Sequence, residues 1–424
     1  MTGNATVGLF LTVAILLATA KLIGLAAVRL GQPAVLGEIV AGIAAGPLLP
    51  DSMWHRLLAP DVLPLVNALA MIGLALFMFV VGYELEGALL RGRARSAVTV
   101  AAGSVLVPLA GGTLVALPLV GRYATGSHLG FVLFLGVAMS VTAFPVLARV
   151  LTERGLERVP LGGLALAAAA VGDVAAWLGL AAVAALCGHG GQWHVGFLPV
   201  YVLILLTVVR PLLRRLFARA AERGVLQRTL LTVLSAGLPL SCAATEWMGV
   251  HYIFGAFAFG VILPRTGPDE VRASVIDGLG QFGGQLLLPL YFVISGSKVD
   301  LSGIGVRGVA VLVLLVAVAV ATKIVGAYVG GGLAGLGHTM SVPLAILMNI
   351  RGLTEIVMLS AGLDLGLIDR RVYSMMVLMA IVTTAMAGPA LNLARVGTTP
   401  SLAAGPRRLG GVPGGGPVST TVST

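Results

Sequence analysis

The chain has 424 residues, of which 58% are hydrophobic and only 10% are charged, against about 25% charged in an ordinary globular protein. With a mean hydropathy of +1.02, it has too little polar surface to cover a body in water, and coiled-coil, collagen-like and disordered classes are excluded as well. The 27 Lys and Arg exceed the 17 Asp and Glu, but no basic stripe with interleaved aromatic residues indicates nucleic acid. The composition predicts a polytopic protein of the lipid bilayer.

Apolar stretches of about 20 residues, the length that crosses a bilayer, predict the transmembrane helices. Several of them are short or are interrupted by Gly and Pro. We expect about 13 helices, in chain order at residues 7–29, 34–49, 64–84, 96–120, 129–148, 162–187, 196–209, 229–246, 250–264, 283–297, 308–330, 341–363 and 372–394.

The Lys and Arg residues predict the orientation of the chain. Eighteen of the 27 lie in the C-terminal tail or in loops that follow odd-numbered helices, six lie in the other loops, and three lie within helices. Because cytoplasmic loops are rich in Lys and Arg, the N-terminus is expected outside and the C-terminus in the cytoplasm. Frequent Ala, Gly, Val and Arg with little Lys are typical of GC-rich bacterial genomes, which suggests the cell inner (plasma) membrane.

An arginine-rich loop at 210–228 divides the chain near its middle, with six predicted helices before the seventh and six after it. Two halves of opposite topology joined by a linker helix are typical of secondary transporters. The tail is rich in Gly, Pro, Ser and Thr and cannot form a core. The predicted division is a transmembrane domain at 1–395, with repeat one at about 7–187, a linker helix at about 196–209 and repeat two at about 229–394, followed by a disordered cytoplasmic tail at 396–424.

Charged residues inside predicted helices are the candidate functional residues, because a charge at the bilayer centre costs at least about 2.5 kcal/mol. Asp173 lies near the midpoint of 162–187, and no residue within ten positions of it can neutralise it. Such a carboxylate can hold either a proton or a hard cation. Lys323 lies in the middle of 308–330 and could pair with Asp173 when no ion is bound, or could reach an interface as a snorkelling side chain.

Two predicted helices contain residues that interrupt a helix at equivalent places in the two halves. Pro145 lies inside the apolar run GVAMSVTAFPVLARVL, where a proline removes a helical hydrogen bond. Its counterpart, ILMNIRGLTEIVMLSAG, carries Gly352 between Arg351 and Glu355. Paired broken helices at the midplane indicate a transporter binding site. Arg351 and Glu355, four residues apart, could pair with each other or could balance the two helix dipoles.

Seven stretches, read in order, resemble the monovalent cation:proton antiporters, and specifically their second family, which contains a sodium/hydrogen exchanger domain. The resemblance covers about residues 7–395. The stretches are GQPAVLGEIVAGIAAGP (31–47), LALFMFVVGYELE (74–86), SVTAFPVLARVLTERGL (140–156), GDVAAWLGLA (172–181), LLPLYFVISGSKVDL (287–301), TKIVGAYVGG (322–331) and NIRGLTEIVMLSAGLDLGLID (349–369).

The resemblance implies an all-α fold of 13 helices in inverted repeats with crossed broken helices, a dimerisation domain that would form a homodimer, and a mobile core domain. By position, Asp173 matches the aspartate that binds the ion and the proton, and Lys323 matches the buried basic residue. Thr142 and the TAFP stretch match the first crossed helix, and Asn349 to Glu355 match the second. Gly172 is a departure, because family members usually have Asn, Asp or Gln directly before the aspartate.

The sequence thus predicts an antiporter that exchanges Na⁺ or K⁺ for H⁺ by alternating access at Asp173, with no enzymatic activity and no cofactor. Two other classes of function stay open. One is a transporter of an organic ion on the same fold, which the altered residue Gly172 favours. The other is a membrane sensor that keeps the fold without transporting, which the presence of Asp173 and Lys323 disfavours.

Overall fold

The computed structural model describes residues 3–48, 59–89, 94–153, 155–156, 159–187, 197–248, 251–265, 269–302 and 304–393. Over these ranges the regular secondary structure is entirely helical, which confirms the predicted all-α class. The tail predicted at 396–424 lies outside the described residues.

The described helices are distributed over both halves of the chain. The first half contains α1 (Gly3–Arg29), α2 (Ala34–Leu48), α4 (Leu63–Leu89), α5 (Ala94–Ala116), a short 3₁₀ turn η1 (Leu117–Leu119), α6 (Val120–Tyr123), α7 (His128–Ser140), α8 (Phe144–Glu153) and α9 (Pro160–Cys187). The second contains α10 (Leu198–Ile204), η3 (Leu205–Val209), α11 (Arg210–Glu222), α12 (Leu226–Trp247), α13 (Tyr252–Ile262), α14 (Asp269–Phe282), η4 (Gly283–Leu287), α15 (Leu288–Ser297), α16 (Gly305–Leu333), α17 (His338–Met348), α18 (Leu353–Asp364) and α19 (Arg370–Leu393).

These helices have the length and composition of a membrane protein. Within the described ranges, seven are long and apolar enough to cross a bilayer. Each of the 13 predicted stretches falls on a helix or on consecutive shorter helices, although the number of crossings itself stays a prediction. Many large apolar side chains are exposed, such as Phe10 at 70% and Val306 at 89%, as expected for surfaces that face lipid.

Two helical runs contain a π-helical turn, η3 and η4. Each turn ends two residues before a proline, Pro211 and Pro289 respectively. Proline has no N–H to donate to the carbonyl four residues earlier, and a π turn accommodates such a gap without ending the helix. The proline positions therefore explain why both runs widen and then continue.

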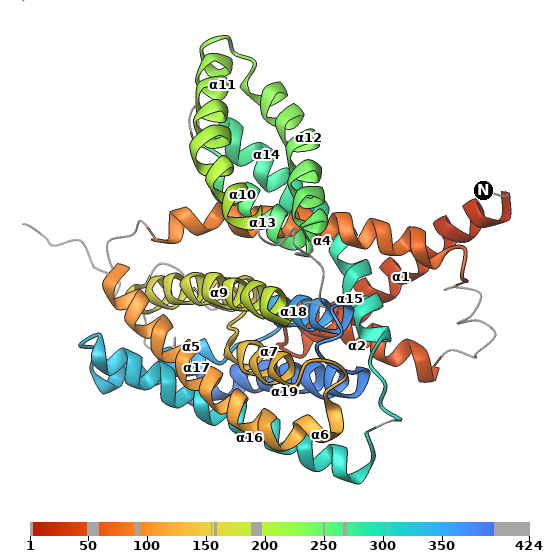
Figure 1. The fold of residues 1–424 in the computed structure, drawn as a ribbon, viewed down its shortest axis with the longest axis vertical. Helices are drawn as coiled ribbons and strands as arrows, with labels where there is room; N and C mark the ends of the chain where they lie inside the picture. Colours follow the sequence, from red (N-terminus) through yellow and green to blue (C-terminus); the bar gives the residue numbers. More distant parts are fainter. Residues whose placement is uncertain are drawn as a thin grey trace, which may run out of the picture.

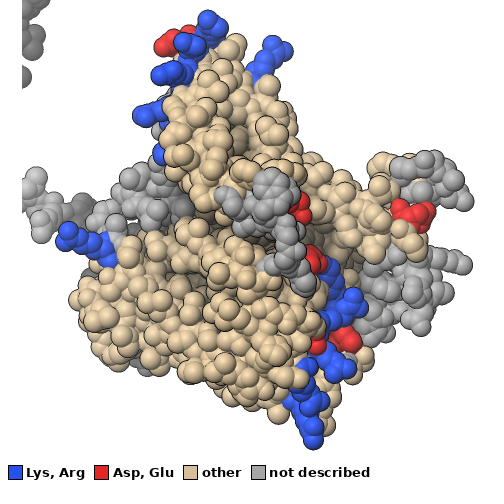
Figure 2. Space-filling model, viewed as in Figure 1, with Lys and Arg blue, Asp and Glu red and all other residues tan. Residues whose placement is uncertain are grey.

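The α11–α12 hairpin projects from the rest of the molecule (Figure 1). The linker helix predicted to end at 209 continues through α11, in which Leu213, Phe217 and Ala220 are buried at spacings of three and four residues. Lys and Arg side chains gather at the tip of the hairpin, whereas much of the face seen in Figure 2 carries no charge. The helix is longer than predicted because these three buried residues form an apolar face that packs while the arginines occupy the exposed face.

The helices form two groups that lie side by side (Figure 1). We call α1, α2, α4, α12, α13 and α15 the scaffold group, because they pack mainly on one another. We call α5, α7, α8, α9, α16, α17, α18 and α19 the crossover group, which is packed around α5 and α16. The two groups contact each other where α4 meets α9 and where α19 hydrogen-bonds to α15.

Paired glycines bring helix backbones together inside each group. In the crossover group, a Cβ on Gly103 of α5 or on Gly326 of α16 would collide with the carbonyl oxygen of the other residue. In the scaffold group, a Cβ on Gly42 of α2 would collide with the carbonyl oxygen of Val293, and a Cβ on Gly296 of α15 would collide with that of Ile39. Small residues at helix contacts permit the close van der Waals packing that holds membrane helices together.

Buried charge is concentrated in the crossover group. Of the residues that the structure describes, five charged side chains are buried, namely Glu38, Asp173, Lys323, Arg351 and Glu355. Glu38 belongs to α2, and the other four belong to α9, α16, α18 and the segment before α18. The charges that the sequence singled out are therefore in the same helix group.

Candidate functional site

Two interrupted helices meet inside the crossover group. Residues 141–143 separate α7 from α8, and residues 349–352 separate α17 from α18. The two interruptions touch, because the N–H of Ala143 donates to the carbonyl of Ile350 at 3.0 Å. The crossed broken helices predicted from the two halves are thus confirmed, and we call this region the crossover.

Pro145 does not lie in the interruption itself, contrary to the prediction that it breaks the helix where it stands. The helix α8 begins at Phe144, so Pro145 occupies its first turn, where a backbone N–H has no intrahelical partner in any case. Thr142, which lies in the interruption, donates its hydroxyl hydrogen to the carbonyl of Met348 at 3.1 Å. The first crossed helix is therefore broken just before the proline and is joined to the second by a side chain.

Arg351 joins the two broken helices electrostatically. Its guanidinium donates to the carbonyl of Met139 at 2.6 Å and to that of Ala138 at 3.5 Å, near the C-terminus of α7. It also forms an ion pair with Glu355 at 3.0 Å, and both side chains are fully buried. A cation stabilises a helix C-terminus, and an anion such as Glu355 stabilises the first turn of the next helix. Both roles predicted for this pair are present together.

The second interruption is held by Gly352 and by Thr384, which the sequence did not single out. Gly352 has a φ of 143°, a conformation that is open to glycine and strained for other residues. The Thr384 hydroxyl donates to the carbonyl of Arg351 at 2.7 Å and accepts from its N–H at 3.3 Å. Thr384 lies in the apolar part of α19, and only its tertiary position reveals this role.

Lys323 is fully buried on α16 and contacts the C-terminus of α7, the helix end that Arg351 also contacts. Its ammonium group donates to the main-chain carbonyls of Ser104, at 2.9 Å, and Ser140. It is not hydrogen-bonded to Asp173, and the predicted direct pairing is therefore not seen in this structure. Lys323 thus supports the C-terminus of α7 rather than occupying the carboxylate.

Asp173 lies on α9 with 2% of its surface exposed. Neither carboxylate oxygen has a hydrogen-bond partner of good geometry. The backbone N–H of Phe144, at the start of α8, lies beside this carboxylate. Buried charges are normally paired, so Asp173 differs from the Arg351–Glu355 pair in having oxygens that are not committed to another residue.

Other uncommitted polar atoms belong to the same region. The described residues contain no group of three or more His, Cys, Asp and Glu side chains placed to hold a metal ion. Further ligands for a cation near Asp173 would therefore come from hydroxyl, amide and main-chain oxygens. Buried side-chain oxygens without a hydrogen-bond partner include Ser104 Oγ, Asn349 Oδ1, Thr354 Oγ1 and Glu355 Oε2.

Gly172 is buried beside Asp173 on α9. A Cβ added there would lie 3.6 Å from Val105 Cγ2 on α5, which is an ordinary contact distance. The backbone therefore does not require glycine at this position. The missing side chain is a property of the sequence and leaves Asp173 without the polar neighbour that the resemblance implies.

These features define a class of protein. An all-helical membrane body, in which two broken helices cross beside a buried carboxylate, is the arrangement of secondary transporters built from inverted repeats. Residues 13–394 match the family described as "Sodium/hydrogen exchanger, transmembrane", and the chain belongs to this family. Its members are transporters rather than enzymes.

Curated relatives cover most of the chain. The chain is 34% identical over 403 residues to the Na⁺/H⁺ antiporter NhaS4 of Synechocystis sp., covering 92% of this chain and 97% of the relative. It is 34% identical over 402 residues to the cation/H⁺ antiporter 20 of Arabidopsis thaliana, covering 90% of this chain and 48% of that longer protein. The resemblance to cation:proton antiporters is therefore confirmed.

A solved structure shares the fold. The sodium proton antiporter MjNhaP1 of Methanocaldococcus jannaschii, solved at pH 8, superposes with a TM-score of 0.57. The comparison covers 92% of this chain and 98% of that protein, at 15% sequence identity. At this identity the likeness shows the fold alone.

Proposed function

We propose that the protein exchanges a monovalent cation, Na⁺ or K⁺, for H⁺ across its membrane, and that Asp173 is the site that the two ions share. The observation that carries the proposal is the buried carboxylate of Asp173, whose two oxygens have no partner. Such a group becomes stable when it takes up a proton or a cation. The names of the relatives, Na⁺/H⁺ and cation/H⁺ antiporters, support the same exchange.

Competition for one carboxylate makes the exchange obligatory. Asp173 is neutral when protonated and is compensated when the ionised form holds a cation. Moving either loaded form through the low-dielectric interior costs little, whereas moving the empty, ionised form is expensive. The protein therefore changes conformation with a proton or with a cation bound, and each crossing in one direction is followed by the return of the other ion.

The crossover supplies the remaining oxygen ligands for a cation. The Thr142 hydroxyl donates its hydrogen to Met348, so its oxygen lone pairs remain available. Asn349 Oδ1 and Thr354 Oγ1 are buried without partners. Oxygen atoms of this kind suit hard cations. We infer that the cation loses hydration water as it binds, and that Asp173 and some of these oxygens replace that water as ligands.

The fixed charges of the crossover have a different role. Arg351 and Lys323 compensate the carbonyl groups at the end of α7, and Glu355 compensates Arg351. These hydrogen bonds and the Arg351–Glu355 ion pair keep the two interruptions in place. Asp173 is then the carboxylate whose charge changes during the cycle, while the surrounding charges position it.

We infer that the crossover group moves against the scaffold group to expose Asp173 to each side in turn. The helix count and the arginine-rich segment at 210–228 support the proposed repeats at about 7–187 and 229–394 and the linker helix, and the resemblance supports a homodimer. The split of Lys and Arg between loops supports an N-terminus outside and a cytoplasmic C-terminus, in the inner (plasma) membrane.

Exchange in everted membrane vesicles tests the function. A respiration-driven pH gradient is followed with a quenched dye, and salts of Na⁺, K⁺ and organic ions are then added. We expect Na⁺ or K⁺ to restore the fluorescence in vesicles that contain the protein and to have no effect in vesicles that lack it. Dissipation by an organic ion alone would favour the altered substrate that Gly172 allows. A gradient that no added ion dissipates would contradict exchange and favour a sensor.

A further inference from the structure

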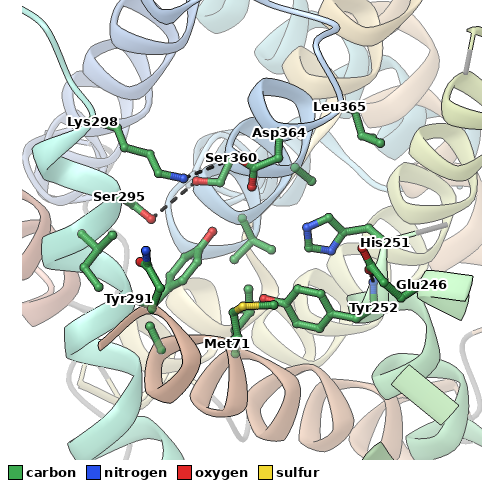
Figure 3. A pocket seen from close by; sticks show the side chains of 16 residues that line it. Met71, Glu246, His251, Tyr252, Tyr291, Ser295, Lys298, Ser360, Asp364 and Leu365 are labelled. Atoms are coloured by element: carbon green, nitrogen blue, oxygen red, sulfur yellow. Dashed lines mark hydrogen bonds and ion pairs between the residues drawn. The ribbon is translucent and has the colours of Figure 1, made fainter. Parts of the chain in front are cut away.

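A polar cavity of about 450 Å³ lies between the scaffold group and α18. Its walls are formed by α4, α12, α13 and α15 on the scaffold side and by α18 on the crossover side. Figure 3 shows side chains from these elements converging on one space. The volume is enough for roughly ten or more water molecules, so a hydrated monovalent cation fits within it.

The cavity follows α18 toward the crossover. Asp364, the last residue of α18, lines one end, and Val357 lines the cavity seven residues deeper. At 1.5 Å per residue this is about 10 Å along the helix, and Gly352 lies about 8 Å beyond Val357. The cavity is therefore an approach to the crossover along the face of α18 that meets the scaffold.

One lysine and two carboxylates line this cavity. The ammonium of Lys298, just after α15, lies 3.6 Å from Asp364 Oδ1, and the Asp364 side chain is 54% exposed. Glu246 also lines the cavity, with one oxygen accepting the N–H of Tyr252 at 2.8 Å. His251 lies at the same wall (Figure 3). Lys298 thus pairs its compact monovalent positive charge with the Asp364 carboxylate, which is accessible from the cavity.

Hydrogen bonds close to this cavity join the scaffold group to the crossover group. The hydroxyl of Tyr373 donates to the carbonyl of Ser295 at 2.8 Å, and the N–H of Asp300 donates to Ser374 Oγ at 2.9 Å. Ser295 and Asp300 lie on α15 or just after it, whereas Tyr373 and Ser374 lie on α19. The Lys298–Asp364 ion pair belongs to this set of contacts and is the member that a dissolved cation can replace.

We propose that Asp364 is a second binding site for the exchanged monovalent cation, at which Lys298 is a tethered competitor. This proposal rests on the exchange function proposed above. A cation that binds Asp364 displaces the ammonium of Lys298 and so removes a link between α15 and α18. The cavity then holds the cation before it reaches Asp173, and its binding loosens the scaffold from the crossover group.

Competition sets the size of the effect. An exposed ion pair favours its closed form by up to about fivefold, and a site that is partly occupied binds its ligand more weakly by the same factor. Removing the competitor in Lys298→Gln should lower the KM for Na⁺ or K⁺ about two- to fivefold with little change in kcat. Lys298→Arg keeps a competing charge and should have a KM close to that of the wild type.

The carboxylate variant has the opposite effect. Asp364→Asn should raise the KM at least about threefold, and in that background Lys298→Gln should have no further effect, because the competed group is gone. Arg307→Gln is the matched control, since Arg307 is an exposed cation near the start of α16 that does not line this cavity. Its KM should equal that of the wild type.

The experiment measures exchange by purified protein in proteoliposomes over a range of NaCl and KCl at constant ionic strength. A KM in Lys298→Gln equal to that of the wild type, or a fall of the same size in Arg307→Gln, would overturn the proposal while leaving the exchange function intact. A change in kcat at constant KM would assign the ion pair a purely structural role and would also overturn it.

Hydrogen–deuterium exchange gives a readout that does not depend on transport. NaCl or KCl, compared with the chloride of a large organic cation, should speed exchange of the Asp300 amide and its neighbours in the wild type. In Asp364→Asn the added cation should make no difference. If wild-type protein transports no cation, the exchange function fails, and the deuterium result still decides the site: a cation-dependent change supports it and an unchanged pattern overturns it.

Discussion

The conformation of Gly352 predicts how strongly the crossover depends on a single glycine. Its φ of 143° and ψ of −116° lie in a region where other residues are strained by about 1–3 kcal/mol. A Cβ there would also lie 3.1 Å from Val146 Cγ2 on α8, which is tighter than an ordinary contact. The lower chain entropy of unfolded alanine offsets about 0.4–1 kcal/mol of this strain, and the tight contact adds to what remains. Gly352→Ala should therefore destabilise the protein by about 1–2.5 kcal/mol.

The chain contains a matched control for this substitution. Gly172 is helical, and a Cβ there meets Val105 Cγ2 at 3.6 Å. Gly172→Ala should therefore stabilise the protein by about 0.5–1 kcal/mol, the usual gain inside a helix. Apparent melting temperatures of purified protein in detergent, at one heating rate, should move in opposite directions. Equal shifts for the two variants, or a higher melting temperature for Gly352→Ala, would refute the reasoning.

Three further predictions concern the charges of the crossover. Lys323→Gln removes a buried cation from the crossover; since a nearby cation favours the ionised form of a carboxylate, the pH profile of exchange should move to higher pH, and an unchanged profile would contradict an influence of Lys323 on the ion site. Arg351→Gln leaves Glu355 buried without its cation, which should cost about 3–5 kcal/mol; adding Glu355→Gln should recover part of the melting temperature, and no recovery would count against the pair. Because Gly172 does not titrate, one carboxylate exchanges one charge for one. Exchange of Na⁺ in proteoliposomes should then be insensitive to a potassium–valinomycin potential, and acceleration by the potential would contradict this stoichiometry.

The site residues that stand out in the sequence without the resemblance share one property: they conflict with their local surroundings. Asp173 and Lys323 are charges in apolar helices, and Pro145 and Gly352 are helix-breaking residues in apolar runs. Such conflicts can be recognised without knowledge of the tertiary structure, because the membrane penalises each of them by itself. This is why the crossed helices and their charges could be predicted from two separate segments of the chain.

The remaining features depend on which helices meet. From the sequence Lys323 could pair with Asp173 or reach an interface, whereas its ammonium binds the carbonyls of Ser104 and Ser140. No pattern in α16 indicates that choice. Thr384 supports the second interruption from another helix, and hydroxyl residues in apolar helices are too common to signal such a role. The cavity between α15 and α18 combines residues distant in the chain, including Glu246 and Asp364.

Exchange by purified protein with and without the Asp173 carboxylate tests the central claim most directly. Wild-type protein and Asp173→Asn are reconstituted into proteoliposomes at equal density. The dissipation of an imposed pH gradient after addition of Na⁺ or K⁺ is then recorded. Asparagine keeps the size of the side chain but neither ionises nor takes up a proton at the carboxylate. The account predicts that exchange disappears in Asp173→Asn while its melting temperature shows a folded protein. Residual exchange above about a tenth of the wild-type rate would contradict the account and place the shared site elsewhere.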